Sequence, residues 1–414
     1  MELKRVVVTG FGAITPIGKN AKDYWESLVK GESGAAPITL FDARNFKTKF
    51  ACEVKDFDPL AHFDKKEAKK MDRNTQLGVV AAREAVEHSR IMEDNVDKNR
   101  VGVIWGSGIG GLETFEKEVL GWANTEIPRF NPFFIPKMIA DITGGQISIE
   151  YGFHGPNYTT VSACASSANA LIDGKMLIQL GKADVIVCGG SEAAVTASGV
   201  GGFNAMMALS TRNDDPTTAS RPFDQDRDGF VLGEGAGTII LEEYEHAKKR
   251  GATIYAELKG GGMSADAYHM TAPHPEGLGA YLVMKNCLED ASVTADEVDH
   301  INMHGTSTPL GDIAESNAIS RLLGDHAFDI QINSTKSMTG HLLGAAGVIE
   351  AIAVIHTIIH NIVPPTINHF TDDPKIDSRL NFTFNHAVKK EVNIAMSNTF
   401  GFGGHNACVL FTKI

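Results

Sequence analysis

Short apolar runs rich in β-branched residues alternate with longer stretches of helical periodicity along the chain. Such runs, bounded by glycine, are typical of strands buried on both faces, so the pattern predicts an α/β fold. The strands predicted in the first part of the chain are 5–10, 100–106, 157–163, 183–190 and 237–243. Asp64 and Glu67 resemble a capping box, which predicts a long helix ending near Ser89.

The order of elements then restarts. A strand and glycine turn at 253–266 resemble the opening of the chain, and three later segments continue the parallel: 298–312, 329–347 and 392–414. We therefore expect two similar halves, 1–252 with the candidate nucleophile and 253–414 with two candidate histidines. No Pro/Ser-rich linker separates the halves, which predicts that they pack as one rigid body.

Composition narrows the classes of function. The chain has 414 residues, 43% of them hydrophobic, which is enough for one large or two ordinary domains. Its formal net charge of −13 argues against nucleic acid or an anionic membrane as partner. The five cysteines are odd in number and widely spread, which disfavours a disulfide framework or a structural metal site. With no signal peptide and no uninterrupted apolar stretch of membrane-spanning length, we expect a cytoplasmic protein.

Cys164 is the candidate nucleophile, in the segment TVSACASSANAL between a predicted strand and a helix expected over about 164–181. Free N–H groups and the dipole at a helix N-terminus lower a thiol pKa and stabilise an oxyanion. A small buried core cysteine is the alternative, and we interpret the other four cysteines in that way.

Two histidines lie in distinctive loops, His304 in MHGTSTPLGD and His341 in STKSMTGHLLGAAG. We expect His341 to open a helix whose dipole favours the neutral imidazole, which can donate to an enolate oxygen. Lys336 is predicted near both histidines, with Glu315 and Glu350 as its anchors. Loop-capping histidines and a surface ion pair are the alternatives.

Several glycine-rich or acidic segments look like other motifs. The glycines of 8–18 and 106–111 match neither a dinucleotide fingerprint nor a phosphate loop. Segment 224–235 resembles a calcium loop, but the closing position is glycine and the flanks are not helical. We therefore expect no metal and no resident cofactor. The glycine turn 398–405 offers backbone N–H groups for an oxyanion and a phenylalanine, Phe402, that could swing.

Five of these segments together resemble the β-ketoacyl-acyl-carrier-protein synthases: SACASSANAL, RPFDQDRDGFVLGEGAG, HGTSTPLGD, NSTKSMTGHLLGAAG and SNTFGFGGHNA. They extend over most of the chain in a consistent order. The resemblance implies a thiolase-like α/β fold with two duplicated halves in an α-β-α-β-α arrangement, assembled as a homodimer. It also implies fatty acid elongation by decarboxylative condensation of malonyl-carrier with an acyl chain on cysteine.

The resemblance further implies a role for individual residues. The catalytic residues would be Cys164, His304, His341 and Lys336. The oxyanion hole and gate would consist of Cys164, Phe400 and Phe402. Pantetheine would contact Thr306 and Thr308, and the acyl pocket would be lined by Ile109 and Phe134. The two-histidine set is similar to the elongating synthases, and the pocket positions favour type II over type I. Phosphopantetheine would be supplied by the carrier protein rather than bound as a cofactor.

The acyl carrier protein would be the macromolecular partner, with malonyl and acyl thioesters as substrates. Because carriers of this family are acidic, we predict a basic docking site at Lys65, Lys66, Lys69, Lys70 and Arg129. A solvated cationic helix end is the alternative. For the whole chain, a standalone ketosynthase of a polyketide pathway stays open; a noncatalytic partner subunit and an NAD-dependent oxidoreductase fit less well.

Overall fold

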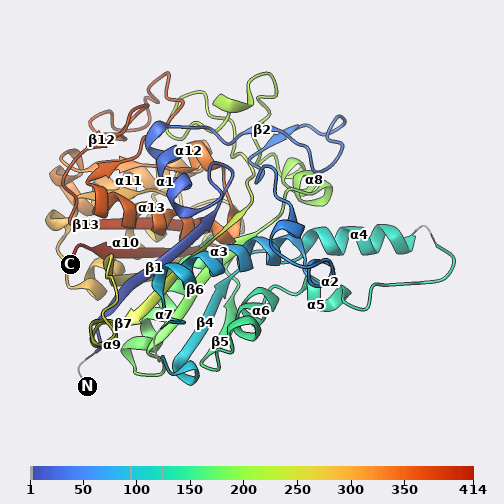
Figure 1. Cartoon of the computed structure of the whole chain (residues 1–414). Helices are drawn as coiled ribbons and strands as arrows, with labels where there is room; N and C mark the ends of the chain where they lie inside the picture. Colours follow the sequence, from blue (N-terminus) through green and yellow to red (C-terminus); the bar gives the residue numbers. More distant parts are fainter. Residues whose placement is uncertain (1–2, 94–95, 124) are drawn as a thin grey trace.

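The computed structural model describes residues 3–93, 96–123 and 125–414, and its centre is a ten-stranded sheet (Figure 1). The strand order is β10-β9-β13-β14-β8-β1-β7-β6-β4-β5. In the first part of the chain the strands are β1 (Val6–Ile14), β4 (Val101–Gly106), β5 (Asn157–Thr160), β6 (Val185–Glu192) and β7 (Gly235–Glu243). In the second part they are β8 (Ala256–Ala265), β9 (His300–Asn302), β10 (Gln331–Asn333), β13 (Ile394–Gly401) and β14 (His405–Thr412).

The sheet repeats one topology twice. Each group contains five strands, and we number them one to five in chain order. From the outer edge of the sheet to its middle, both groups then have the same order: three, two, four, five, one. The two first strands, β1 and β8, meet antiparallel through the pairs Val7–Glu257 and Val8–Ala256. This repeated order supports our proposal of two halves, 1–252 and 253–414, which would meet in the loop before β8.

Helices cover and separate the two groups of strands. Helices α7 (Ser166–Gln179) and α13 (Ala346–His360) pack against each other and against strands of both groups, so they form the middle layer. Helix α3 (Arg73–Ser89) covers the outer face of the first group, and α10 (Leu278–Ala291), backed by α11 (Gly311–Leu323), covers that of the second. The α/β thiolase-like fold expected from the sequence is thereby confirmed.

The helix predicted to run from Asp64 to Ser89 is interrupted. Asp64 caps α2 (Lys65–Lys70), Met71 is extended, and Asp72 caps a second helix, α3, through the N–H of Asn74. The predicted end at Ser89 is correct. Half of the predicted capping box forms, because Asp64 accepts the N–H of Glu67 at 2.9 Å. The Glu67 carboxylate does not complete it and pairs with Lys70 at 2.7 Å instead.

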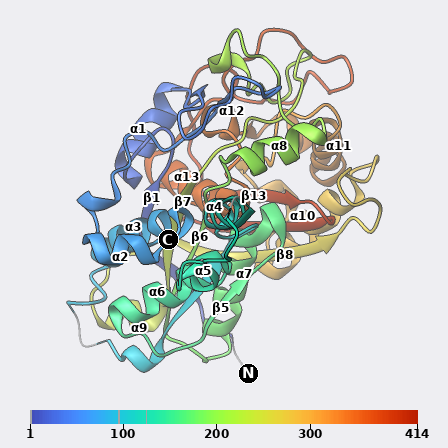
Figure 2. The same ribbon diagram turned by 90° about the vertical axis from the view of Figure 1, so that its right-hand side faces the viewer.

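An arm projects from the body at the right of Figure 1 and towards the viewer in Figure 2. It consists of α4 (Leu112–Ala123) and a return segment that leads to α5 (Phe134–Met138). The remaining helices of four or more residues are α1 (Ala21–Lys30), α6 (Ile142–Tyr151), α8 (Ala197–Ala205), α9 (Tyr244–Lys249) and α12 (Lys336–Thr339). Two small ladders, β2 (Ala36–Pro37) with β3 (Phe50–Ala51) and β11 (Ile362–Val363) with β12 (Val388–Lys389), complete the strands of the described residues.

One helical stretch, Leu343–His360, has the length and composition to cross a membrane, with a mean hydropathy of 1.7. However, 89% of that window is buried inside the protein. Its apolar residues fill the middle layer between the two groups of strands, which accounts for its composition without a membrane.

Candidate active site

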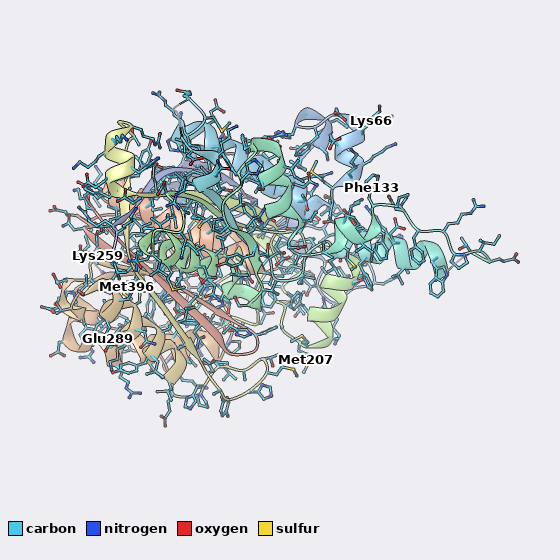
Figure 3. All side chains as sticks on the ribbon, turned by 90° about the horizontal axis from the view of Figure 1, so that it is seen from below. Lys66, Phe133, Met207, Lys259, Glu289 and Met396 are labelled. Atoms are coloured by element: carbon cyan, nitrogen blue, oxygen red, sulfur yellow. The ribbon has the colours of Figure 1, made fainter. Side chains whose placement is uncertain are left out.

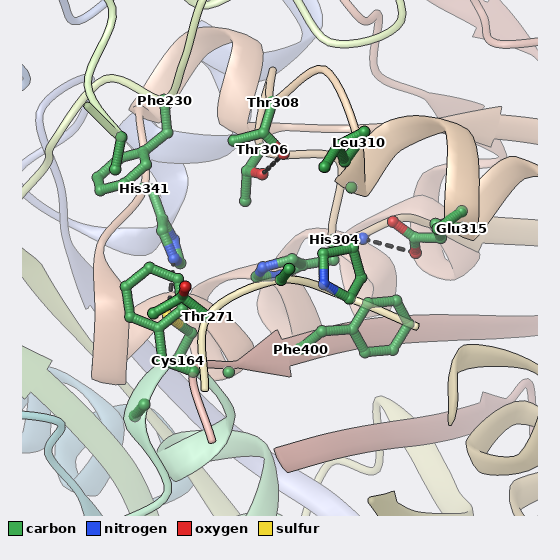
Figure 4. A pocket seen from close by; sticks show the side chains of 18 of the residues that line it. Cys164, Phe230, Thr271, His304, Thr306, Thr308, Leu310, Glu315, His341 and Phe400 are labelled. Atoms are coloured by element: carbon green, nitrogen blue, oxygen red, sulfur yellow. Dashed lines mark hydrogen bonds between the residues drawn. The ribbon is translucent and has the colours of Figure 1, made fainter. Parts of the chain in front are cut away.

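A cavity of about 610 Å³ is lined by residues from within 108–230 and 266–406 and has Cys164 in its wall (Figure 4). Its lining combines segments that are far apart in the sequence. Of the residues singled out from the sequence, it contains Ile109, Cys164, His304, Thr306, Thr308, Glu315, His341, Phe400 and Phe402. The hydroxyls of Thr306 and Thr308 lie 3.1 Å apart in this wall.

The serine-rich motif around Cys164 builds a tight turn that holds the sulfur. Cys164 lies in a short 3₁₀ turn, Ala163–Ala165, directly before α7. Ser166 clamps this turn, because its hydroxyl donates to the carbonyl of Ala163 at 2.7 Å and accepts from the N–H of Ser162 at 2.9 Å. The clamp holds Ala163 at φ +50°, a left-handed conformation that only surrounding structure maintains in a residue with a Cβ.

The two histidines meet at this sulfur. Nε2 of His341 lies 2.9 Å from Sγ of Cys164. The ring of His304 stands edge-on to that of His341, with centroids 5.2 Å apart, and Phe400 lies 5.5 Å from His304. Both imidazoles therefore face the space beside the thiol where a thioester carbonyl would bind.

His341 does not open a helix, contrary to the sequence prediction. It forms a β-bridge with Leu232: its N–H donates to Val231 at 2.7 Å, and its carbonyl accepts from Gly233 at 2.9 Å. Helix α13 begins only at Ala346. The segment 221–237, for which no chemical role was predicted, thus holds His341 in place.

Burial, rather than a helix dipole, keeps both imidazoles neutral. It lowers the pKa of His341 and of His304 well below the usual range, and the charge of Lys336 lowers both further. The expected neutral state is therefore present, but its physical cause differs from the one predicted.

The environment of Cys164 differs from the expectation of a lowered thiol pKa. Burial raises the pKa of Cys164 to about 12, and the charge of Glu192 raises it too. The Lys336 charge and the backbone N–H groups of Phe402 and Cys164 lower this pKa without outweighing burial. Cys164 and His341 therefore form a neutral thiol–imidazole pair in this structure.

Lys336 is fully buried and pairs with Glu350, which is also fully buried. Burial raises the pKa of the Glu350 carboxyl to about 7, although Lys336 opposes this shift. Glu315, the second predicted anchor, does not hydrogen-bond to Lys336. Its carboxylate accepts the N–H groups of His304 at 2.9 Å and Gly305 at 3.0 Å, so it holds the His304 loop instead.

The segment 221–237 also braces the His304 loop. Arg227 is buried and donates to the carbonyls of Thr308 and Pro309 at 3.1 and 2.9 Å. In the part of the segment that resembles a calcium loop, Asp224 accepts the N–H groups of Phe370 and Thr371 at 2.7 and 2.8 Å. This carboxylate is therefore engaged in fixing loops.

The glycine turn after β13 faces the sulfur. A Cβ on Gly401 would lie 2.7 Å from the carbonyl of Ser162, so glycine is required where the turn passes the Cys164 loop. The following N–H, of Phe402, points at Cys164 Sγ together with the N–H of Cys164 itself. The two N–H groups therefore lie beside the sulfur, where the carbonyl oxygen of an acyl group attached to it would accept them.

Other predicted site residues lie outside this cavity. Phe134 lies in α5 and stacks on Phe130 with centroids 5.5 Å apart, and it is absent from the cavity wall. Lys65, Lys66 and Lys69 are exposed on α2. Their neighbour Lys70 is half-buried beside Glu67, and Arg129 is exposed on the arm. Lys66 and the arm residue Phe133 lie on the same side in Figure 3, and Lys70 Nζ lies 6.0 Å from the Phe133 ring.

Sequence reasoning missed Glu192, a fully buried glutamate at the end of β6. Its carboxylate accepts backbone N–H groups from the loop after β4 and from the turn before α13. Burial raises its pKa to about 7, and those N–H groups oppose the shift. The available signal was a single acidic residue at the end of the apolar run 183–190, where nothing solvates a charge.

Comparisons with known sequences fit this geometry. The family descriptions "Beta-ketoacyl synthase, N-terminal domain" and "Beta-ketoacyl synthase, C-terminal domain" match residues 3–247 and 255–370. Similar proteins include the 3-oxoacyl-[acyl-carrier-protein] synthase 2 of Synechocystis sp., 48% identical over 100% of this chain and 99% of the relative. The same-named protein of Coxiella burnetii is 47% identical over 100% of both chains.

Solved structures give the same result. A beta-ketoacyl synthase from Burkholderia phymatum has a TM-score of 0.92 and 34% identity, covering 99% of this chain and 100% of that one. A type II PKS ketosynthase, bound to the hexaketide in complex with its acyl-carrier protein, has a TM-score of 0.92 and 32% identity over 100% of both chains. The chain belongs to the β-ketoacyl synthase family. It is a condensing acyltransferase.

Proposed function

We propose that this chain acts as a 3-oxoacyl-acyl-carrier-protein synthase that elongates fatty acids by two carbons per cycle. The single observation that carries the proposal is the approach of His341 Nε2 to within 2.9 Å of Cys164 Sγ, in the wall of a 610 Å³ cavity that also contains His304. A nucleophile beside a base, with N–H groups aimed at the developing charge, suits acyl transfer.

In the first half-reaction the Cys164 sulfur attacks the carbonyl of an acyl thioester. The thiol proton passes to His341 Nε2, and the N–H groups of Cys164 and Phe402 stabilise the oxyanion. When the tetrahedral intermediate collapses, the bond to the carrier sulfur breaks. That sulfur takes the proton from His341 and leaves as a thiol, while the acyl chain remains on Cys164.

In the second half-reaction a malonyl thioester occupies the space beside the two imidazoles. Once Cys164 is acylated it no longer donates to His341, and exchange with water moves the single ring proton of His341 from Nδ1 to Nε2. The Nε2–H of His341 and a ring N–H of His304 then donate to the malonyl carbonyl oxygen while the carboxylate leaves as CO₂, so the electron pair forms an enolate. The enolate carbon attacks the acyl-Cys164 carbonyl and expels the thiolate. The product is a 3-oxoacyl thioester two carbons longer, and the Cys164 thiolate takes a proton from water, because loss of CO₂ from the malonyl carboxylate consumes one proton overall.

Intact-mass spectrometry tests the nucleophile. After incubation with dodecanoyl-loaded carrier protein, the wild-type chain should gain one acyl group, and peptide mapping should place it on Cys164. The variant Cys164→Ala should gain none, while Cys188→Ala, which changes another buried cysteine in the core of β6, should acylate as the wild type does. An unmodified wild-type chain, or an adduct elsewhere, refutes the proposal.

A polyketide ketosynthase is the second candidate, because a solved type II PKS ketosynthase shares the fold at 32% identity and the ishigamide ketosynthase/chain length factor shares it at 35%. The full-length relatives named 3-oxoacyl-[acyl-carrier-protein] synthase 2 are more similar, at 46–48%. This difference favours fatty acid elongation of the type II class. The proposed site of action is the cytoplasm.

The carrier protein is the proposed partner, and α2 is its proposed docking site. Three exposed lysines gather on this short helix: Lys65, Lys66 and Lys69. Helix α2 lies on the face turned to the viewer in Figure 2, and so does α8, whose end borders the cavity at Met206. A cationic surface on the face where the cavity opens attracts an acidic carrier and orients its pantetheine arm.

A second copy of the chain is the proposed oligomeric partner. The arm exposes apolar side chains such as Ile127, which is 66% exposed, and edge strand β5 is followed by Val161, 62% exposed. Such apolar surface and an unpaired strand edge are costly in water. A homodimer covers both, and the arm of one copy could carry its Phe134 to the acyl pocket of the other.

A further inference from the structure

Glu192 is a buried carboxylate beside the cavity that no step of the proposed reaction uses. Its Oε2 accepts the N–H of Gly108 at 2.8 Å and of Gly344 at 3.0 Å. Its Oε1 accepts the N–H of Ile109 at 3.2 Å and of Gly110 at 3.3 Å. Four backbone donors occupy about all the acceptor sites of a carboxylate, whereas a single hydrogen bond is enough to satisfy most buried polar groups.

These donors come from two loops that are distant in the sequence. Gly108, Ile109 and Gly110 follow β4, whereas Gly344 lies in the turn Leu343–Ala345 before α13. A Cβ on either Gly108 or Gly344 would lie 2.7 Å from Glu192 Oε2. Glycine at both positions therefore lets the two backbones close on the same carboxylate.

Both loops form the cavity wall around the nucleophile. Ile109 and Leu343 line the cavity with Cys164. Leu343 is almost fully buried and has φ +46°, an unfavourable conformation for a residue with a branched side chain. Because the next N–H, of Gly344, is fixed by Glu192, the carboxylate maintains the conformation that directs Leu343 towards Cys164.

We propose that Glu192 is a positioning residue that holds Ile109 and Leu343 in the acyl-binding wall and thereby sets which acyl chains Cys164 accepts. This inference rests on the proposed condensing function. A long acyl chain must pass along this wall, whereas a short one remains beside the sulfur. Movement of the two loops therefore changes long-chain acylation more than short-chain acylation.

The substitution Glu192→Gln tests the proposal because it retains size but not acceptor capacity. A carboxylate presents acceptors on both oxygens, whereas an amide presents one oxygen and one NH₂ group. In either orientation the NH₂ group of glutamine opposes two of the four N–H donors. The matched control is Glu84→Gln, another largely buried carboxylate that accepts two N–H groups, of Ala13 and Ala21, away from the cavity.

The rate of Cys164 acylation is measured for carriers loaded with butanoyl and with dodecanoyl groups. For Glu192→Gln we expect the ratio of dodecanoyl to butanoyl kcat/KM to fall about tenfold or more. The ratio is the readout because loss of the Glu192 charge beside Cys164 acts on both substrates alike. Glu84→Gln should keep the wild-type ratio. Equal losses for both chain lengths, or an unchanged ratio in Glu192→Gln, overturn the inference.

If Glu192→Gln does not fold, a second variant disturbs the Glu192 carboxylate by changing one of the residues that donate to it. In Gly108→Ala the new Cβ displaces Oε2, so the ratio of dodecanoyl to butanoyl acylation should fall here too. An unchanged ratio in Gly108→Ala also overturns the inference. If the wild-type chain itself acylates with neither carrier, the proposed function has failed; a normal wild type with an unaltered variant ratio refutes only the role of Glu192.

Discussion

At the scale of single residues, burial controls the reactivity of Cys164. Its pKa is raised to about 12, so the thiol is protonated throughout the neutral range. We predict that alkylation of Cys164 by iodoacetamide accelerates roughly tenfold per pH unit between pH 7 and 9, because only the thiolate reacts. Peptide mass spectrometry at several pH values measures this rate, and a plateau below pH 8 would show instead that the site stabilises the thiolate.

The buried pair of Lys336 and Glu350 is the second residue-scale feature. Lys336→Met leaves Glu350 without its counter-charge, and we predict a loss of about 3–5 kcal/mol in the free energy of unfolding. The double variant Lys336→Met with Glu350→Leu should recover most of this stability, because no charge is then left buried. Urea unfolding of the four members of this cycle measures the coupling.

The pH dependence of the single variant has a definite sign. Burial raises the pKa of Glu350 to about 7 in the folded chain, above its unfolded value of about 4.5, so the folded state binds the extra proton between these values. Without Lys336 this pKa rises further. The destabilisation by Lys336→Met should therefore be smaller at pH 6 than at pH 8, and an equal loss at both values contradicts this assignment.

At the scale of elements, α2 presents its lysines to solvent instead of using them in the core. We predict that charge reversal at Lys66 and Lys69 raises the KM for carrier-bound substrates about tenfold and leaves the KM for free thioester analogues unchanged. Lys70 is avoided because it already pairs with Glu67. The control is charge reversal at Lys249, an exposed lysine on α9, and an equal effect on both substrate classes excludes docking at α2.

At the scale of the whole molecule, the projecting arm and edge strand β5 leave apolar surface that one chain does not cover. We predict that the wild type sediments with twice the mass of one chain at micromolar concentration. Ile127→Glu combined with Val161→Glu should yield monomers, because charges in the interface cannot be solvated. The equally apolar, exposed Ile414→Glu at the C-terminus should leave the dimer intact; a monomeric wild type refutes the assembly.

The sequence by itself determined the α/β class and the approximate positions of the strands, because buried strands need local apolar runs. Motif spacing also singled out Cys164, His304 and His341, and the structure brings these residues together at one cavity. Glycine and short polar residues also indicated where the chain turns, because their effect on the backbone extends only over a few neighbouring residues.

Only the tertiary structure decided the electrostatics of the site. The thiol pKa rises because the sulfur is buried, and burial depends on layers contributed by both halves. His341 is held by a β-bridge to Leu232, more than 100 residues away, and not by its own helix. Glu192 joins loops separated by over 200 residues. Such contacts leave no periodic pattern in the sequence, so the sequence alone could not reveal them. They follow from how the two groups of strands pack around the helices between them.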